Sequence, residues 1–168
     1  MENENQRIEM KVEGLTLDPV TNMPIIILKD LEGKRALPIW VGIFEANAIA
    51  LEMEKITTPR PMTHDLIKNI FDGVDAVVNY VCVNDLKDNT FYALISLMVA
   101  GMEVTIDSRP SDAIAVALRV RAPILVAKKV IDEARSFDVS TGSVIGENDQ
   151  WKNWLDNIKP SDFGKMDQ

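Results

Sequence analysis

The chain has a single cysteine, Cys82, and a single histidine, His64. One cysteine cannot form a disulfide within the chain, and one residue of each type is too few for a Cys/His zinc site. Cys82 lies in an apolar, strand-like run, which indicates a small buried hydrophobic residue. These shortages exclude a disulfide scaffold and a zinc-binding module.

Long apolar runs and an excess of basic residues are also missing. No apolar run approaches the ~18 residues that a membrane helix needs, and the polar residues 1–6 carry no secretory signal. We therefore expect a cytoplasmic protein without a membrane partner. The net charge is −8, with 18 Lys and Arg against 26 Asp and Glu. This balance argues against a broad phosphate-binding surface but permits a small site that meets a phosphodiester locally.

What is present is the composition of an ordinary globular protein, with 46% hydrophobic and 26% charged residues. At 168 residues we expect one main domain. The expected division is a disordered N-terminus (1–7), a domain (8–135), a linker rich in Gly, Ser, Thr and Asp (136–148), and a C-terminal helical extension (149–168). The extension is expected to pack on the domain or on a second subunit through one apolar helical face, which holds Trp151, Trp154, Leu155 and Ile158.

Alternating and β-branched runs separated by turn residues predict the strands. The expected strands cover residues 8–17, 23–31, 35–41, 74–83, 90–100, 102–106 and 124–126. Helical periodicity predicts helices at 44–55, near 63–72, from 110 to about 122, and at 127–135. Runs of strands followed by helices, without strict alternation, predict an α+β fold: two antiparallel or mixed strand sets, each followed by helices.

The third of these helices is preceded by a dense polar stretch. Asp107, Ser108, Arg109, Ser111 and Asp112 surround Pro110, which suits the first position of a helix. A strand therefore delivers polar groups to a helix N-terminus, where free N–H groups favour anions. Capping of the helix by the two carboxylates is the simpler interpretation. A site for a divalent metal or a phosphate is the functional one.

A second helix begins in the same way. Residues 58–65 again contain Arg-Pro followed by a hydroxyl and an aspartate, and they include His64. The helix is expected to bury one apolar face, made of Leu66, Ile67, Ile70 and Phe71. His64 beside Asp65 is interpreted as a general base or a metal ligand, with a capping or surface histidine as the alternative.

The remaining charged groups allow two interpretations each. Asp107 and Asp112 are five residues apart across a turn, so both are able to face one hard cation such as Mg²⁺ or Mn²⁺. Arg60 and Arg109 are suited to holding a phosphate, or to pairing with neighbouring acids. Glu45 lies in the first turn of its helix, where an acid interacts favourably with the helix dipole. The functional interpretation is that Glu45 faces the same cleft as the two Arg-Pro stretches.

Four stretches together resemble the bifunctional nuclease family, and the similarity covers about residues 8–135. They are residues 37–50 (LPIWVGIFEANAIA), 59–66 (PRPMTHDL), 90–93 (TFYA) and 106–119 (IDSRPSDAIAVALR). Met62 stands where leucine is expected, a change that conserves volume. The resemblance implies an α+β fold that self-associates, so a homo-oligomer is expected, and nuclease activity on RNA and DNA.

The residues that match the polar motifs of this family then receive roles from chemistry. We expect Asp107, Asp112 and Glu45 to hold a divalent metal, Mg²⁺ or Mn²⁺, that activates water. His64, oriented by Asp65, would be the general acid or base, and Arg60 and Arg109 would stabilise developing charge. Thr63 and Ser111 would contact the substrate.

Two other interpretations stay open. In the first, the polar cleft belongs to a non-catalytic, ligand-binding or regulatory module, which the acidic charge and the lack of a basic, aromatic groove favour. Alternatively, the Arg-Pro motifs build the fold or a dimer, with arginines paired to buried aspartates.

Overall fold

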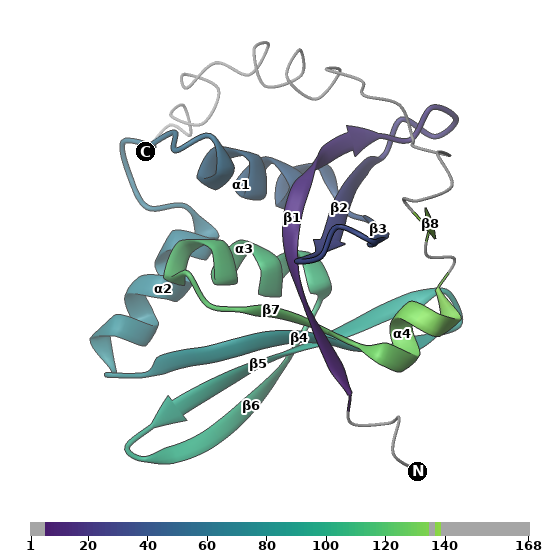
Figure 1. Cartoon of the computed structure of the whole chain (residues 1–168). Helices are drawn as coiled ribbons and strands as arrows, with labels where there is room; N and C mark the ends of the chain where they lie inside the picture. Colours follow the sequence, from purple (N-terminus) through teal and green to yellow (C-terminus); the bar gives the residue numbers. More distant parts are fainter. Residues whose placement is uncertain (1–5, 135–136, 139–168) are drawn as a thin grey trace.

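The computed structural model describes residues 6–134 and 137–138, and it shows an α+β protein (Figure 1). The strands are β1 (Arg7–Leu17), β2 (Pro24–Asp30), β3 (Arg35–Trp40), β4 (Val77–Lys87), β5 (Thr90–Val99), β6 (Met102–Ser108), β7 (Ile124–Ala127) and β8 (Phe137–Asp138). The helices are α1 (Ile43–Met53), α2 (Thr63–Gly73), α3 (Pro110–Val120) and α4 (Lys128–Glu133). The predicted fold class is confirmed. The predicted C-terminal helix and most of the predicted linker lie outside the described residues, but Phe137–Asp138 of that linker forms β8, which pairs with β3.

The two predicted strand sets form one continuous sheet, in the order β6-β5-β4-β7-β1-β2-β3-β8. The short strand β7 joins them, because it pairs parallel with β4 and antiparallel with β1. All other pairings are antiparallel between strands linked by turns, apart from the contact of β3 with β8. The sheet is therefore mixed, and its single parallel pair depends on a strand of only 4 residues.

A β-bulge explains the unusual apolar pattern of β1. Met10 and Leu15 are both buried in the core, although they lie an odd number of positions apart. Side chains alternate between the two faces of a strand, so an undistorted strand would place these two on opposite faces. The register of β1 against β2 shifts between Val12 and Gly14. This extra residue restores Leu15 to the core face.

Helix α3 lies at the centre of the helical layer. It packs against α1 and α2 on its sides and against β4 and β5 of the sheet (Figure 1). Burial on several sides explains why every residue from Ala113 to Ala117 is buried, rather than a single helical stripe. Pro110 occupies the first turn, and the helix ends at Arg121, which has a left-handed conformation before Ala122 and Pro123.

Helix α2 buries less than the sequence predicted. Ile67 and Phe71 are partly buried against the core, but Leu66 and Ile70 are 53% and 52% exposed. The predicted single apolar face is therefore wrong for these two residues. The reason is that α2 packs beside α3 and not directly on the sheet, so only the side toward α3 is covered. The residue it buries most fully is His64.

Cys82 is buried in β4, as predicted. Burial raises the pKa of its thiol, and this effect outweighs the nearby positive charge of Arg7. No described helix is both long and apolar enough to cross a membrane.

Candidate functional site

The N-terminal ends of α2 and α3 meet at a hydrogen bond between His64 and Asp112. His64 Nε2 lies 2.8 Å from Asp112 Oδ1. An ionised carboxylate only accepts hydrogen bonds, so Nε2 donates in this pair and Nδ1 is the ring nitrogen left for another partner. The polar first turns of α2 and α3 therefore lie in direct contact here.

Arg109 extends the contact to a third helix. Its Nε donates to Asp112 Oδ2 at 2.7 Å, and its Nη2 donates to Glu45 Oε1 at 2.8 Å. Arg109 is the N-cap residue of α3, while Glu45 lies in the first turn of α1. The four side chains of Glu45, Arg109, Asp112 and His64, called here the helix-start chain, therefore tie three helix N-terminal ends together.

Exposure differs strongly along the helix-start chain. The side chain of Arg109 is 66% exposed, that of Asp112 26% and that of His64 only 8%. A large ligand is thus able to reach Arg109, while His64 is accessible to little more than a water molecule. The chain leads from an exposed cation to a nearly buried imidazole.

Asp112 is held in its charged form by its neighbours. Partial burial raises the pKa of its carboxyl, but hydrogen bonds and charge interactions from Arg109 and His64 outweigh that effect and lower it below its ordinary value. Hydrogen bonds to Asp112 and Glu45 in turn raise the pKa of Arg109. Glu45, Arg109 and Asp112 therefore alternate in charge along the helix-start chain.

The sequence analysis expected Asp65 to orient His64, but Asp65 has other partners. Its Oδ1 accepts from Arg119 Nε at 2.6 Å, and its Oδ2 accepts from the backbone N–H of Met62 at 2.9 Å. The carboxylate beside His64 is Asp112 instead. Adjacent residues of a helix point about 100° apart, so His64 and Asp65 reach different partners on α3.

Arg119 is the important residue that the sequence analysis missed. Its side chain is 5% exposed, and it also donates to the backbone carbonyls of Ala115 and Ala48. It therefore connects α1, α2 and α3 from within. An available signal was its position seven residues after Asp112, which places both on the same face of α3.

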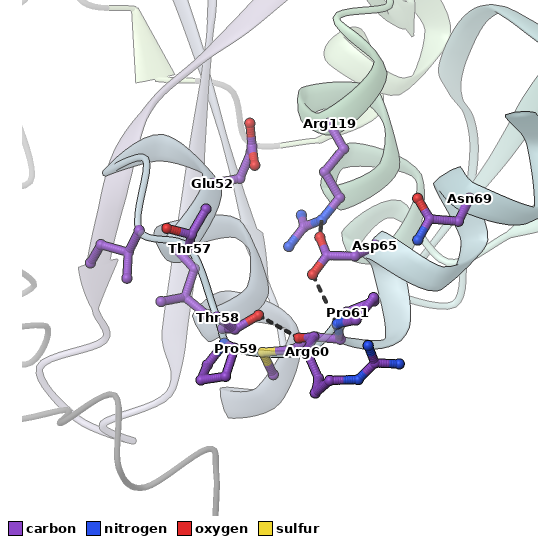
Figure 2. A pocket seen from close by; sticks show the side chains of 12 residues that line it. Glu52, Thr57, Thr58, Pro59, Arg60, Pro61, Asp65, Asn69 and Arg119 are labelled. Carbon is purple, nitrogen blue, oxygen red and sulfur yellow. Dashed lines mark hydrogen bonds and ion pairs between the residues drawn. The ribbon is translucent and has the colours of Figure 1, made fainter.

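A pocket of about 280 Å³ opens beside Asp65 and Arg119 (Figure 2). Figure 2 shows Glu52, Thr57 and Thr58 across the hollow from Arg119 and Asp65. Its lining comes from the end of α1, the loop before α2, the first turns of α2, and Arg119 of α3. His64 and Asp112 are not among its lining residues. The pocket is thus a neighbour of the helix-start chain and not part of it.

The other predicted site residues lie around these two features. Arg60 is exposed at the pocket, Thr63 is the exposed first residue of α2, and Ser111 is buried in the first turn of α3. Asp107 is exposed on the edge strand β6. Within residues 6–134, no hydrogen bond or ion pair joins Asp107 to the helix-start chain.

The donor set does not form a ready metal site. Among the described residues, no group of three or more His, Cys, Asp or Glu side chains is placed to hold a metal ion. Of the three predicted ligands, Glu45 and Asp112 are bridged by the guanidinium of Arg109. A cation would have to displace this group, because two positive charges cannot share the same carboxylates at low cost. In this arrangement the three predicted ligands therefore do not fit a bound divalent metal.

Comparison with known proteins places the chain among relatives over most of its length. The sequence model described as the bifunctional nuclease domain matches residues 26–138. An uncharacterized protein of Mycobacterium tuberculosis is 36% identical over 162 residues, which is 92% of this chain and 97% of that protein.

Plant relatives match over a smaller share. Bifunctional nuclease 1 of Arabidopsis thaliana is 31% identical over 109 residues, which cover 62% of this chain and 34% of that protein. Bifunctional nuclease 1 of Oryza sativa subsp. japonica is 28% identical over 62% of this chain and 33% of its own length. The shared region thus corresponds to about a third of each plant protein.

Proposed function

Because the chain belongs to the bifunctional nuclease domain family, we propose that it hydrolyses phosphodiester bonds of RNA and DNA at the helix-start chain. The observation that carries this proposal is the continuous contact from the exposed Arg109 through Asp112 to His64. This contact combines a cation that is able to bind a phosphate, Arg109, with a histidine–carboxylate pair that is able to transfer a proton, His64 and Asp112.

Arg109 is the group proposed to bind the phosphate. Its guanidinium is the most exposed member of the chain, and it lies at the N-terminus of α3, where backbone N–H groups also favour an anion. Arginine binds phosphate oxygens through two parallel N–H groups. Glu45 and Asp112 fix the orientation of this side chain before the substrate arrives, and its charge would stabilise the charge that develops on the phosphate.

The His64–Asp112 pair is proposed to move the proton. DNA has no 2′-hydroxyl to act as an internal nucleophile, so cleavage of both nucleic acids at one site needs another nucleophile, and here that nucleophile is proposed to be water. The oxygen of this water bonds to phosphorus, its proton passes to the pair, and the bond from phosphorus to the leaving oxygen breaks. That oxygen then takes up a proton. The small exposure of His64 suits it to contact a water molecule rather than the substrate itself.

A divalent metal stays a prediction of the sequence analysis. In the proposed mechanism the protein's own side chains suffice, because Arg109 occupies the place that a cation between Glu45 and Asp112 would take. Cleavage in Mg²⁺, Mn²⁺ and EDTA measures the requirement directly. Loss of all cleavage in EDTA would contradict the assignment of the electrostatic role to Arg109 alone.

The test of the proposal is cleavage of labelled RNA and DNA by the purified protein and by His64→Gln. Glutamine keeps an amide that donates to Asp112, which protects the fold, but it cannot take up a proton. We expect cleavage to fall about 10²-fold or more. Lys68→Ala, on the same helix but paired only with the exposed Asp72, is the matched control and should cleave normally. Equal activity of His64→Gln and wild type would refute the site.

A non-catalytic regulatory module is the second candidate. The burial of His64 favours it, because a histidine that ties α2 to α3 needs no substrate. On that interpretation the wild type shows no cleavage above that of His64→Gln, while His64→Ala, which leaves Asp112 without this donor, loses thermal stability.

A further inference from the structure

We propose that the pocket beside Asp65 and Arg119, called here the loop pocket, receives one nucleobase of the bound strand, and that it selects bases with an exocyclic amino group. This inference rests on the proposed nuclease function and adds a specificity subsite to it. Cytosine, adenine and guanine carry such an amino group, whereas uracil and thymine do not.

The loop pocket lies within reach of a strand held at the helix-start chain. Asp65 directly follows His64, and Arg119 lies two helical turns beyond Asp112 along α3. Seven residues of helix correspond to about 10 Å. Successive stacked nucleotides rise ~3.4 Å each along a strand. A strand whose phosphate contacts Arg109 is therefore able to place a base about three nucleotides away in the loop pocket.

The charges around the loop pocket balance. Glu52 and Asp65 contribute two carboxylates, and Arg60 and Arg119 contribute two guanidinium groups. A free multivalent anion or a free cation would gain little from such a balanced set. A neutral ligand that both donates and accepts hydrogen bonds fits it better, and a nucleobase is such a ligand.

The acceptors in the loop pocket favour an amino group. Glu52 uses Oε1 to bind the exposed Lys55, and no hydrogen bond within residues 6–134 involves its Oε2. Asn69 and Thr57 likewise form no side-chain hydrogen bonds within this part of the chain, and both line the pocket. Carboxylates accept from the amino group of cytosine, and asparagine pairs with the amino edge of adenine. Uracil carries a carbonyl oxygen where cytosine carries the amino group, and this oxygen would face the carboxylate of Glu52 unfavourably.

The walls of the loop pocket are apolar and held in place. Leu51, Ile56 and Met62 line it together with Pro59 and Pro61, which flank Arg60. Proline fixes its own φ, and the hydroxyl of Thr58 donates to the carbonyl of Arg60 at 2.7 Å, so the loop has few alternative shapes. A volume of about 280 Å³ is at the small end for ligand pockets, which suits a single base. None of the described residues that line the pocket is aromatic, so the binding is expected to be weak without the rest of the strand.

The experiment is a titration of the full chain with CMP and with UMP, followed by NMR or calorimetry under conditions without cleavage. We expect CMP to bind about tenfold more tightly than UMP, the effect of one hydrogen bond to a charged acceptor. Glu52→Gln and Asn69→Ala should each reduce this preference. Glu54→Gln, a neighbouring acid that does not line the pocket, is the matched control and should keep it.

Equal binding of CMP and UMP by the wild type, or an unchanged preference in both Glu52→Gln and Asn69→Ala, would overturn the inference. Failure of the proposed function is a separate result. A wild type that prefers CMP but cleaves no nucleic acid refutes the nuclease proposal and leaves the loop pocket as a nucleotide site. A wild type that cleaves but shows no base preference refutes the loop pocket alone.

Discussion

Two arginines of this protein show how burial changes the work of one residue type. Arg109 is 66% exposed and joins Glu45 to Asp112, while Arg119 is 5% exposed and joins Asp65 to two backbone carbonyls. An exposed ion pair is screened by water and stabilises little. A buried one leaves uncompensated partners when it is broken. We therefore assign function to Arg109 and folding to Arg119.

Alanine at each position separates these roles. Arg119→Ala should reduce the free energy of unfolding by about 3–5 kcal/mol, because Asp65 and two carbonyls lose their partner. Arg109→Ala should reduce it by about 1 kcal/mol or less, yet it should remove most of the cleavage. Urea unfolding and a cleavage assay on both variants measure this. Similar losses of stability in the two would contradict the assignment.

Asp112 predicts how stability depends on pH. Its pKa in the folded protein is lower than in the unfolded chain, so below neutrality the unfolded state takes up protons first. The stabilisation from Asp112 is complete above the unfolded pKa of about 3.9 and is lost as pH falls through the folded pKa. When the pH falls from about 5 to 2, the free energy of unfolding of Asp112→Asn should therefore decrease less than that of the wild type. Parallel unfolding curves for the two proteins over this range would exclude the effect.

At the scale of elements, the absence of a side chain at Gly42 leaves room for Glu45 at the start of α1. Gly42 is the N-cap of α1 and has an ordinary extended backbone, so its role is spatial and not conformational. A Cβ atom at this position would collide with Oε2 of Glu45. The colliding atom is the end of a flexible side chain, which moves at low cost.

Gly42→Ala should accordingly displace Glu45 from Arg109 without unfolding the protein. We expect a melting temperature close to that of the wild type together with reduced cleavage, since Arg109 loses one of its two anchors. Thermal unfolding and kinetics on one preparation test this. Full activity in Gly42→Ala would show that Glu45 does not position Arg109.

Most elements were predictable because their signals are local. Pro110 and the polar residues around it predicted the start of α3, and alternation predicted the strands. The burial of α2 was predicted incorrectly, since periodicity gives the width of an apolar face but not the neighbour that covers it. The partner of His64 was also missed, because Asp65 is adjacent in sequence while Asp112 is adjacent only after folding.

At the scale of the whole molecule, the sequence did not predict a single sheet. The two strand sets were recognisable, but β7 pairs with β1 and β4, which lie far from it in the chain. Such pairing leaves no local trace beyond a short apolar run. The pocket and the role of Arg119 were missed for the same reason, because both need three helices to be placed together.

The net charge of −8 predicts a weak dependence of nucleic-acid binding on salt. Arg109 is proposed to bind a phosphate, and with Arg60, which the sequence also suits to this, at most about two counterions are released, so log K against log[salt] should have a slope no steeper than about −1.4 for a single strand. Binding of a non-cleaved oligonucleotide across a salt series measures this slope. A value steeper than about −4 would indicate a broad basic surface that this account does not contain.

His64 and Asp112 are proposed to act as one proton-transferring unit, and a double-mutant cycle distinguishes such a unit from two independent contributions. Single-turnover cleavage rates would be measured for the wild type, His64→Gln, Asp112→Asn and the double variant, each checked for folding. Residues that act as a unit lose nearly the whole effect with the first substitution. We predict that each single variant falls about 10²-fold or more and that the double variant is no slower than the slower single one. Independent, multiplying losses, or wild-type rates in either single variant, would contradict the claim.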